Sequence, residues 1–296
     1  MARNAVAAAE GGESIVGEAV APVESPAAIE LEGATVRYGR QTVWREVDLT
    51  IPEGEFAAVL GPNGAGKTTL VRAILGVQPL AEGSVRVFGR RVRRGNDEIG
   101  YLPQRRHFDP DLRIRGVDLV RLGLDGGRWG VPLPSLVRPR GDGVEGRVRA
   151  AIATVGAEAY ARRPIGELSG GEQQRLLIAQ ALVTGARILL LDEPLESLDL
   201  NNQRAISSLV QRICREQGVT VLIVAHDVNP LLPHLDRVVY VARGQALSGA
   251  PRDVIRSETL SSLYGAHIEV LRTQDGRLVV VGQQDETVSY HGAGAD

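Results

Sequence analysis

Residues 61–69 read Gly61-Pro62-Asn63-Gly64-Ala65-Gly66-Lys67-Thr68-Thr69, a glycine-rich run between two apolar segments. The segment before it, residues 57–60, follows Pro52 and Gly54 and has the length of a short buried strand. The apolar residues after it recur at helical spacing as far as Gly76. The sequence therefore predicts a glycine-rich turn that joins a strand to the N-terminus of a helix.

This turn fits the pattern G-x-x-x-x-G-K-[S/T] of a phosphate-binding loop. Its glycines let consecutive backbone N–H groups converge on an anion, and the helix dipole adds to the attraction. Lys67 can then reach the β- and γ-phosphates of a nucleotide, and the Thr68 hydroxyl can ligate Mg²⁺. An ordinary strand-to-helix turn is the alternative, but the strand and helix on either side favour a phosphate loop.

Lys67 is the only lysine in the chain, and every other basic side chain is an arginine. An ammonium group is a compact point charge that fits inside a backbone cradle, whereas a planar guanidinium does not. We therefore expect hydrolysis of the nucleotide to need Lys67.

The bulk properties restrict the class of protein. The chain has 296 residues, of which 43% are hydrophobic and 24% charged, as in soluble globular proteins of one large or two modest domains. A net charge of −2 does not indicate nucleic-acid binding. The single cysteine, Cys214, excludes an intramolecular disulfide and fits a reducing cytosol. We expect no membrane span and no secretory signal, so a partner would have to do any spanning.

The chain divides into three parts. Residues 1–28 are rich in Ala, Gly, Glu and Val without periodicity, and we expect a disordered leader. Residues 29–282 form the predicted domain, with strands expected at 29–32, 34–38 and 46–51, and with edge strands at 238–244 and 269–281. Within it, residues from about 112 to 170 read as an inserted, mostly helical subdomain. Residues 283–296 read as a polar tail.

A second helix start is predicted at Leu168-Ser169-Gly170-Gly171-Glu172, the end of the inserted subdomain. Ser169 and Glu172 form an S-x-x-E capping box, which is the mark of an ordinary helix start. However, Gly170 and Gly171 leave the first N–H groups without covering side chains, so this N-terminus is also suited to an anion.

Two acids follow a predicted buried strand at residues 188–192. In open α/β sheets ligands bind at the carboxyl ends of the strands, so Asp192 would join the Mg²⁺ shell and Glu193 would polarise an attacking water. The next strand, residues 219–225, ends at His226, which is either structural or a contact to the γ-phosphate. Tyr38 either stacks on an adenine or is a half-buried strand tyrosine. The other histidines make no metal-ligand constellation.

Together these motifs resemble the nucleotide-binding subunit of an ATP-binding cassette (ABC) transporter over residues 29–281. The resemblance depends on the segment Leu168–Gly171, which we call the signature segment, lying in order between Gln104 and Asp192. It implies an α/β fold, namely a P-loop NTPase core of the ABC-ATPase type. An antiparallel β subdomain and an inserted helical subdomain would complete it.

The resemblance also implies a role for each matching residue. Glu193 is the general base, and Lys67, Gln104 and His226 assist at the γ-phosphate. Gln104 also joins Thr68 and Asp192 around Mg²⁺ and links to the membrane partner. The implied ATP contacts are Tyr38, Gly61, Pro62, Asn63, Gly64, Ala65, Gly66, Lys67, Thr68, Thr69, Ser169, Gly170, Gly171 and Asp199. Of these, the signature residues and Asp199 act on the ATP of the opposite subunit. Glu172 replaces the commoner glutamine, which should be tolerated because it keeps the capping role.

The implied assembly is a homodimer that sandwiches two ATP molecules with Mg²⁺ and drives integral membrane permease subunits. A substrate-binding protein would act indirectly, no nucleic acid would be bound, and the chain would lie in the cytoplasm on the inner face of the cell membrane. Closure of the dimer would move the permease, and hydrolysis would reset it.

The substrate is suggested by smaller segments that are similar to the zinc/manganese branch of these ATPases. They are residues 104–105 with Asp109, then 193–199, 226–230, 235–237, 257–260 and 263–265. Residues 110–115 depart from the usual aromatic-proline pattern of that branch. An importer of iron chelates, haem or cobalamin is the nearest alternative. A cytosolic cassette ATPase acting on DNA or ribosomes would need coiled-coil insertions or a second cassette, and a phosphate-loop kinase would need an acceptor site.

Overall fold

The computed structural model describes residues 26–104, 108–125, 142–274 and 277–281. Nearly all of the expected leader, the middle of the inserted segment and the expected tail lie outside these residues, as does Arg105. Within the described part, no helix combines the length and the apolar character that crossing a bilayer requires.

The first sheet is antiparallel and has the order β2-β1-β4-β5. Its strands are β1 (Ala27–Tyr38), β2 (Gln41–Pro52), β4 (Glu82–Val87) and β5 (Arg90–Arg91). The sequence predicts two strands where the structure has the single strand β1, which starts two residues before residue 29. The predicted break at Gly33 is an irregularity in the pairing with β2, where Gly33 has a φ of 52°. One extra residue therefore bends this strand without ending it.

The second sheet has six strands in the order β10-β9-β3-β8-β7-β6. They are β3 (Phe56–Leu60), β6 (Ile99–Leu102), β7 (Ile188–Asp192), β8 (Thr220–Val224), β9 (Arg237–Ala242) and β10 (Gln245–Gly249). All neighbours pair in parallel except β9 and β10. The continuous apolar runs of β3, β7 and β8 are buried along their whole length, as expected for strands covered on both faces.

The prediction that residues 238–244 form an edge strand is wrong. Strand β9 pairs with β3 on one side and with β10 on the other, and five of its six residues are buried. The sequence shows an apolar run that also suits a central strand, and the short hairpin to β10 supplies the real edge.

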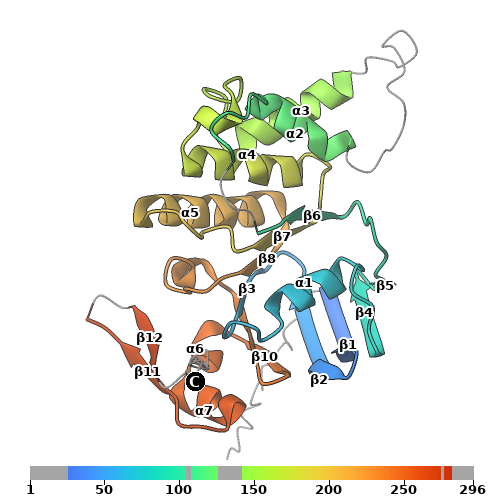
Figure 1. Ribbon diagram of the computed structural model, residues 1–296, viewed down its shortest axis with the longest axis vertical. Helices are drawn as coiled ribbons and strands as arrows, with labels where there is room; N and C mark the ends of the chain where they lie inside the picture. Colours follow the sequence, from blue (N-terminus) through green and yellow to red (C-terminus); the bar gives the residue numbers. More distant parts are fainter. Residues whose placement is uncertain (1–25, 105–107, 126–141, 275–276, 282–296) are drawn as a thin grey trace, which may run out of the picture.

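The two faces of the six-stranded sheet carry separate cores because neighbouring residues of a strand point to opposite faces. In β3, Ala57 and Val59 pack with the antiparallel sheet and with α1 (Lys67–Ile74). Phe56, Ala58 and Leu60 pack on the opposite face with α4 (Gly170–Leu182) and α5 (Leu200–Gln217). Figure 1 shows α1 between the two sheets and α5 above the larger one.

A helical layer occupies one end of the molecule (Figure 1, top). It contains α2 (Gly116–Asp125), α3 (Asp142–Thr154), a short 3₁₀ helix (Ile165–Glu167) and α4. The opposite end holds α6 (Pro251–Val254), α7 (Ser257–Tyr264) and the hairpin of β11 (Glu269–Arg272) and β12 (Leu278–Val281). A second 3₁₀ helix (Leu232–His234) contacts α5. The six-stranded sheet lies between the helical layer and the opposite end of the molecule, and so do the loops that follow β3, β6, β7 and β8.

Candidate functional site

The glycine-rich loop follows β3 directly, and two of its glycines have no room for a side chain. A Cβ at Gly61, where φ is 142°, would stand 2.0 Å from the carbonyl oxygen of Val241. A Cβ at Gly66, where φ is 99°, would stand 2.6 Å from Cγ1 of Val43 and 2.9 Å from Cδ1 of Trp44. The backbone of the loop is thus pressed against β9 on one side and β2 on the other, which only glycine permits.

Helix α1 begins without a side chain over its first N–H groups. Its N-cap is Gly66 in the left-handed conformation, no side chain caps it, and its first turn holds no acid. The first N–H groups of a helix have no partner within the helix, and the helix dipole makes this end positive. The start of α1 is therefore suited to an anion such as a phosphate group.

Lys67 is folded back over the same loop. Its Nζ donates hydrogen bonds to the carbonyl oxygens of Gly61 (2.8 Å) and Pro62 (2.9 Å), and only 6% of the residue is exposed. Burial lowers the pKa of the Lys67 ammonium, while the nearby carboxylates of Glu193 and Asp192 act in the opposite direction. The ammonium is thus held at the point where the loop and the acids meet.

Asp192 ends strand β7 and is buried, with Oδ1 lacking any hydrogen-bond partner. Burial raises the pKa of its carboxyl, and the neighbouring charge of Glu193 raises it further. A buried carboxylate oxygen without a partner is a site where a hard cation fits. The described residues contain no cluster of three or more His, Cys, Asp or Glu side chains that could hold a metal by themselves. A cation here would therefore take its other ligands from hydroxyl, amide, phosphate and water oxygens, as Mg²⁺ commonly does.

Glu193 connects the ends of three neighbouring strands. Its Oε1 lies 2.6 Å from Nε2 of His226, two residues beyond β8. Its Oε2 accepts a hydrogen bond of 2.5 Å from Nε2 of Gln104, two residues beyond β6. Glu193 itself has a φ of 53°, a strained conformation for a residue with a side chain.

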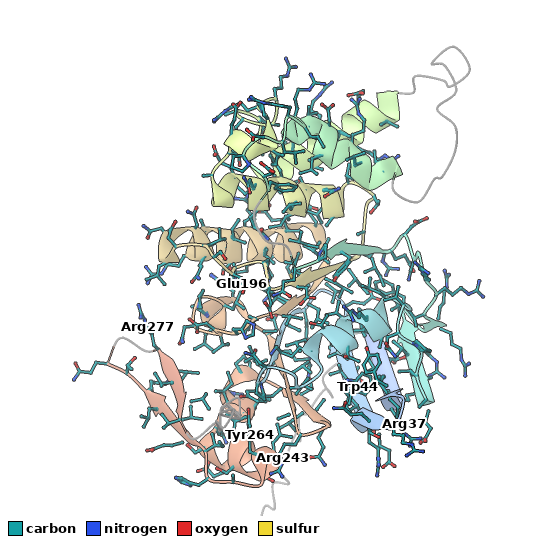
Figure 2. All side chains as sticks on the ribbon, viewed as in Figure 1. Arg37, Trp44, Glu196, Arg243, Tyr264 and Arg277 are labelled. Atoms are coloured by element: carbon teal, nitrogen blue, oxygen red, sulfur yellow. The ribbon has the colours of Figure 1, made fainter. Side chains whose placement is uncertain are left out.

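Four of these groups, Lys67, Gln104, Glu193 and His226, line one cleft of about 490 Å³. Gly61, Pro62, Ala65 and Asp192 are not among its lining residues, and Asp192 lines a smaller hollow instead. Tyr38, 46% exposed, stands at its rim. Glu196 also lines the cleft, although sequence reasoning assigned it no role, and Figure 2 labels it near the centre of the molecule below α5. The lining residues are Tyr38, Val43, Asn63, Gly64, Gly66, Lys67, Thr68, Thr69, Gln104, Glu193, Glu196 and His226.

The signature segment does not line this cleft. Ser169 is the N-cap of α4, where its Oγ accepts from the Glu172 N–H (3.3 Å) and its own N–H donates to Glu172 Oε2 (2.8 Å). This is the predicted capping box. Gly170 instead lines a smaller hollow of about 40 Å³, on whose wall Glu193 and Ser197 also lie.

Asp199 caps the neighbouring helix α5, and it does not line the cleft either. It accepts from the N–H groups of Asn201 and Asn202, both at 3.0 Å, and the bonds to Asn202 hold the pKa of its carboxyl below the usual range. The Asn202 side chain in turn packs on Gly171, where a Cβ would stand 2.4 Å from Oδ1. The signature segment and Asp199 thus form a second group of residues, separate from the cleft within one chain.

Comparison with known proteins agrees with this geometry. Residues 44–196 match a family model described as "ABC transporter". The manganese transport system ATP-binding protein MntB of Bacillus subtilis (strain 168) is 36% identical over 244 residues, which are 82% of this chain and 95% of that protein. The zinc transport system ATP-binding protein TroB of Treponema pallidum (strain Nichols) is 38% identical over 241 residues, 81% of this chain and 88% of that protein.

A solved structure is similar as well. The dimeric structure of a bacterial ABC transporter cassette superposes with a TM-score of 0.60 at 28% identity. The match covers 75% of this chain and 98% of the other.

Proposed function

This chain belongs to the ABC transporter family, and from that premise we propose that it hydrolyses ATP to drive a transporter that imports zinc or manganese. The binding and hydrolysis of ATP follow from family membership. The choice of metal is supported by the two relatives above, which are named for manganese and for zinc transport. In this account the metal is cargo that passes through other subunits and does not touch this chain.

The observation that carries the hydrolytic role is the Glu193 carboxylate, held between Gln104 and His226 at the wall of the cleft. We assign to Glu193 the acceptance of a proton from the attacking water, because a carboxylate within hydrogen-bond reach of that water is a competent general base. We assign two roles to His226: it contacts the γ-phosphate, and it orients the Glu193 carboxylate beside it.

Binding of the nucleotide falls to the loop and to α1. The free N–H groups at the start of α1 and the Lys67 ammonium would hold the phosphates, and Tyr38 at the rim would stack on the adenine. The residues that would hold Mg²⁺ are Thr68, Gln104 and Asp192. When bound, that cation neutralises charge on the phosphate oxygens during transfer.

The second group of residues implies a partner. Ser169, Gly170, Gly171 and Asp199 lie outside the cleft of their own chain, so we assign them to the ATP held by a second copy. Two copies would then form a homodimer with two composite sites, as closed two-fold symmetry allows. The dimer would work with membrane permease subunits, on the cytoplasmic face of the membrane, and indirectly with a substrate-binding protein.

Transport tests this proposal directly. The chain would be purified with its membrane subunits and reconstituted in vesicles with ATP on the side of this chain. We expect ATP hydrolysis to rise, and Zn²⁺ or Mn²⁺ to accumulate, when the metal-loaded binding protein is added. Stimulation only by iron chelates, haem or cobalamin would replace the metal assignment, and stimulation by DNA without membrane subunits would remove the transport role.

The general base is tested by Glu193→Gln. The amide cannot take a proton from water, so we expect hydrolysis to fall by at least about a hundredfold while ATP binding persists. A dimer should also be trapped in the presence of ATP, visible as a shift in size-exclusion chromatography. The matched control is Glu258→Gln in α7, an exposed glutamate outside the cleft. A Glu193→Gln chain with normal turnover would assign the base elsewhere.

A further inference from the structure

A second glutamate, Glu196, contacts the same amide as Glu193. The Gln104 Nε2 donates to Glu193 Oε2 at 2.5 Å and to Glu196 Oε2 at 3.2 Å. Glu196 lies on the loop between β7 and α5 and lines the cleft. The amide nitrogen of Gln104, which follows β6, therefore donates to two carboxylates that both follow the neighbouring strand β7.

The two contacts determine which way the amide faces. A glutamine amide has two N–H donors on its nitrogen and only acceptor lone pairs on its oxygen, and an ionised carboxylate can only accept. Two carboxylates on one side of the amide thus require its nitrogen there, because the reverse orientation would set oxygen against oxygen. The planar group then turns its Oε1 away from both acids. With Glu193 alone, one N–H would suffice and the amide could rotate about that bond.

We propose that Glu196 is a positioning residue that fixes the Gln104 amide so that its Oε1 is presented as an oxygen ligand to the cation bound with ATP. This inference rests on the proposed binding of ATP and Mg²⁺. It adds a residue to which the sequence motifs give no role. Glu196 touches neither nucleotide nor cation in this account and acts only through Gln104. Hard cations such as Mg²⁺ require near-ideal placement of each oxygen, so a freely rotating amide is a poorer ligand.

The test is the Mg²⁺ dependence of nucleotide binding, which does not need turnover. Binding of a fluorescent ATP analogue would be titrated with Mg²⁺, and also measured without metal. For Glu196→Ala we expect the half-saturating Mg²⁺ concentration to rise by about threefold or more, as for other coupled neighbours. Affinity for the analogue without metal should not weaken. Glu258→Ala, which removes an exposed carboxylate that does not line the cleft, should match the unaltered chain.

Two further variants separate positioning from charge. Glu196→Gln removes the charge but keeps an oxygen that accepts from Gln104, so it should restore most of the Mg²⁺ affinity lost in Glu196→Ala. In a Gln104→Ala background, Glu196→Ala should add nothing, because the residue through which it acts is gone.

Three results would overturn the inference: an unchanged Mg²⁺ requirement in Glu196→Ala, equal defects in Glu196→Ala and Glu196→Gln, or an undiminished effect of Glu196→Ala without Gln104. If the unaltered chain fails to bind the analogue with Mg²⁺ at all, the proposed function itself has failed.

Discussion

Helices α1 and α4 both begin beside glycines, but their first turns are completed differently. The N-cap of α1 is Gly66, with no capping side chain, whereas the N-cap of α4 is Ser169, which forms a reciprocal capping box with Glu172. At α1 the free N–H groups open into a cleft lined by Lys67 and Glu193. At α4, by contrast, side chains of the chain itself accept hydrogen bonds from the N–H groups of Ser169 and Glu172.

The two helix starts differ in how much they depend on a ligand, as the proposed division of the site between two chains requires. The α1 region contains a glycine-rich loop, a buried lysine and a buried acid with no hydrogen-bond partner at one oxygen. Such groups cost stability unless a ligand completes them. The start of α4 is capped by side chains of the chain itself, so these hydrogen bonds do not depend on a ligand. The following predictions change one region or the other.

The largest effect is expected from Lys67→Arg in the α1 region. The guanidinium is too wide to replace an ammonium held by the carbonyls of Gly61 and Pro62, so its charge will not reach the same point. We expect hydrolysis to fall by about a hundredfold or more, as for loss of one group that stabilises transition-state charge. Release of inorganic phosphate measures this. Near-normal turnover would show that the site does not discriminate between the two cations.

A smaller effect, a gain in stability, is expected from Asp192→Asn. Because the folded pKa of Asp192 is raised, the native chain binds more protons than the unfolded chain between the ordinary aspartate pKa, about 3.9, and the raised value. The ionised carboxylate therefore lowers stability as pH rises through this range. At pH 7 we expect the variant to melt about 2–4 °C higher while Mg²⁺-dependent ATP binding weakens.

The gain in melting temperature should disappear as the pH falls to the ordinary aspartate range, where both chains are neutral at residue 192. Calorimetry at several pH values measures it. Asp199→Ala provides the contrast, because that acid caps α5 and its loss should lower stability at pH 7. A melting temperature for Asp192→Asn below that of the unaltered chain at pH 7 would contradict the description of Asp192 as a buried carboxylate whose ionised form is disfavoured.

The smallest effect is expected at the α4 end. Ser169→Ala removes the Oγ that accepts from the Glu172 N–H and should cost about 1 kcal/mol of unfolding free energy. Glu172→Gln keeps a side-chain acceptor for the Ser169 N–H and should change stability far less. Urea denaturation of the two variants compares them. Equal losses would mean that the charge of Glu172, and not the capping geometry, supports this helix start.

The sequence predicts the cleft better than it predicts the sheets around it. The turn from β3 into α1 and the two acids at the end of β7 depend on neighbours in the chain. The structure places Lys67 and Glu193 in one cleft with Gln104 and His226, whereas Asp192 does not line that cleft. The sequence places β9 at an edge because an apolar run of five residues does not reveal which strands it pairs with. Pairing between β9 and β3 joins segments far apart in the chain, and no local pattern encodes it.

Glu196 was missed for a related reason. An exposed glutamate in a short loop before a helix is typically solvated, and the contact of Glu196 with Gln104 joins the loop after β7 to the loop after β6. The available signal is the parallel pairing itself, because the loops that follow two adjacent parallel strands meet at one edge of the sheet. The roles of Ser169, Gly170, Gly171 and Asp199 toward a nucleotide remain predictions, because they concern a second copy of the chain.

The central claim is that one chain carries half of each site, and mixing two inactive variants tests it most directly. Lys67→Arg disables the cleft and leaves the signature segment intact. Gly170→Asp would repel a phosphate from the signature segment but is compatible with a helix N-terminus and leaves the cleft intact. In a mixed dimer, one of the two composite sites combines an intact cleft with an intact signature segment.

ATP hydrolysis would be measured for each variant alone and for an equal mixture after dissociation and reassembly, with the membrane subunits present. We expect each variant alone to be inactive and the mixture to recover up to about a quarter of the normal rate, because half of the dimers then contain one intact site. A mixture no more active than the sum of its parts would contradict the account and place the whole site within one chain.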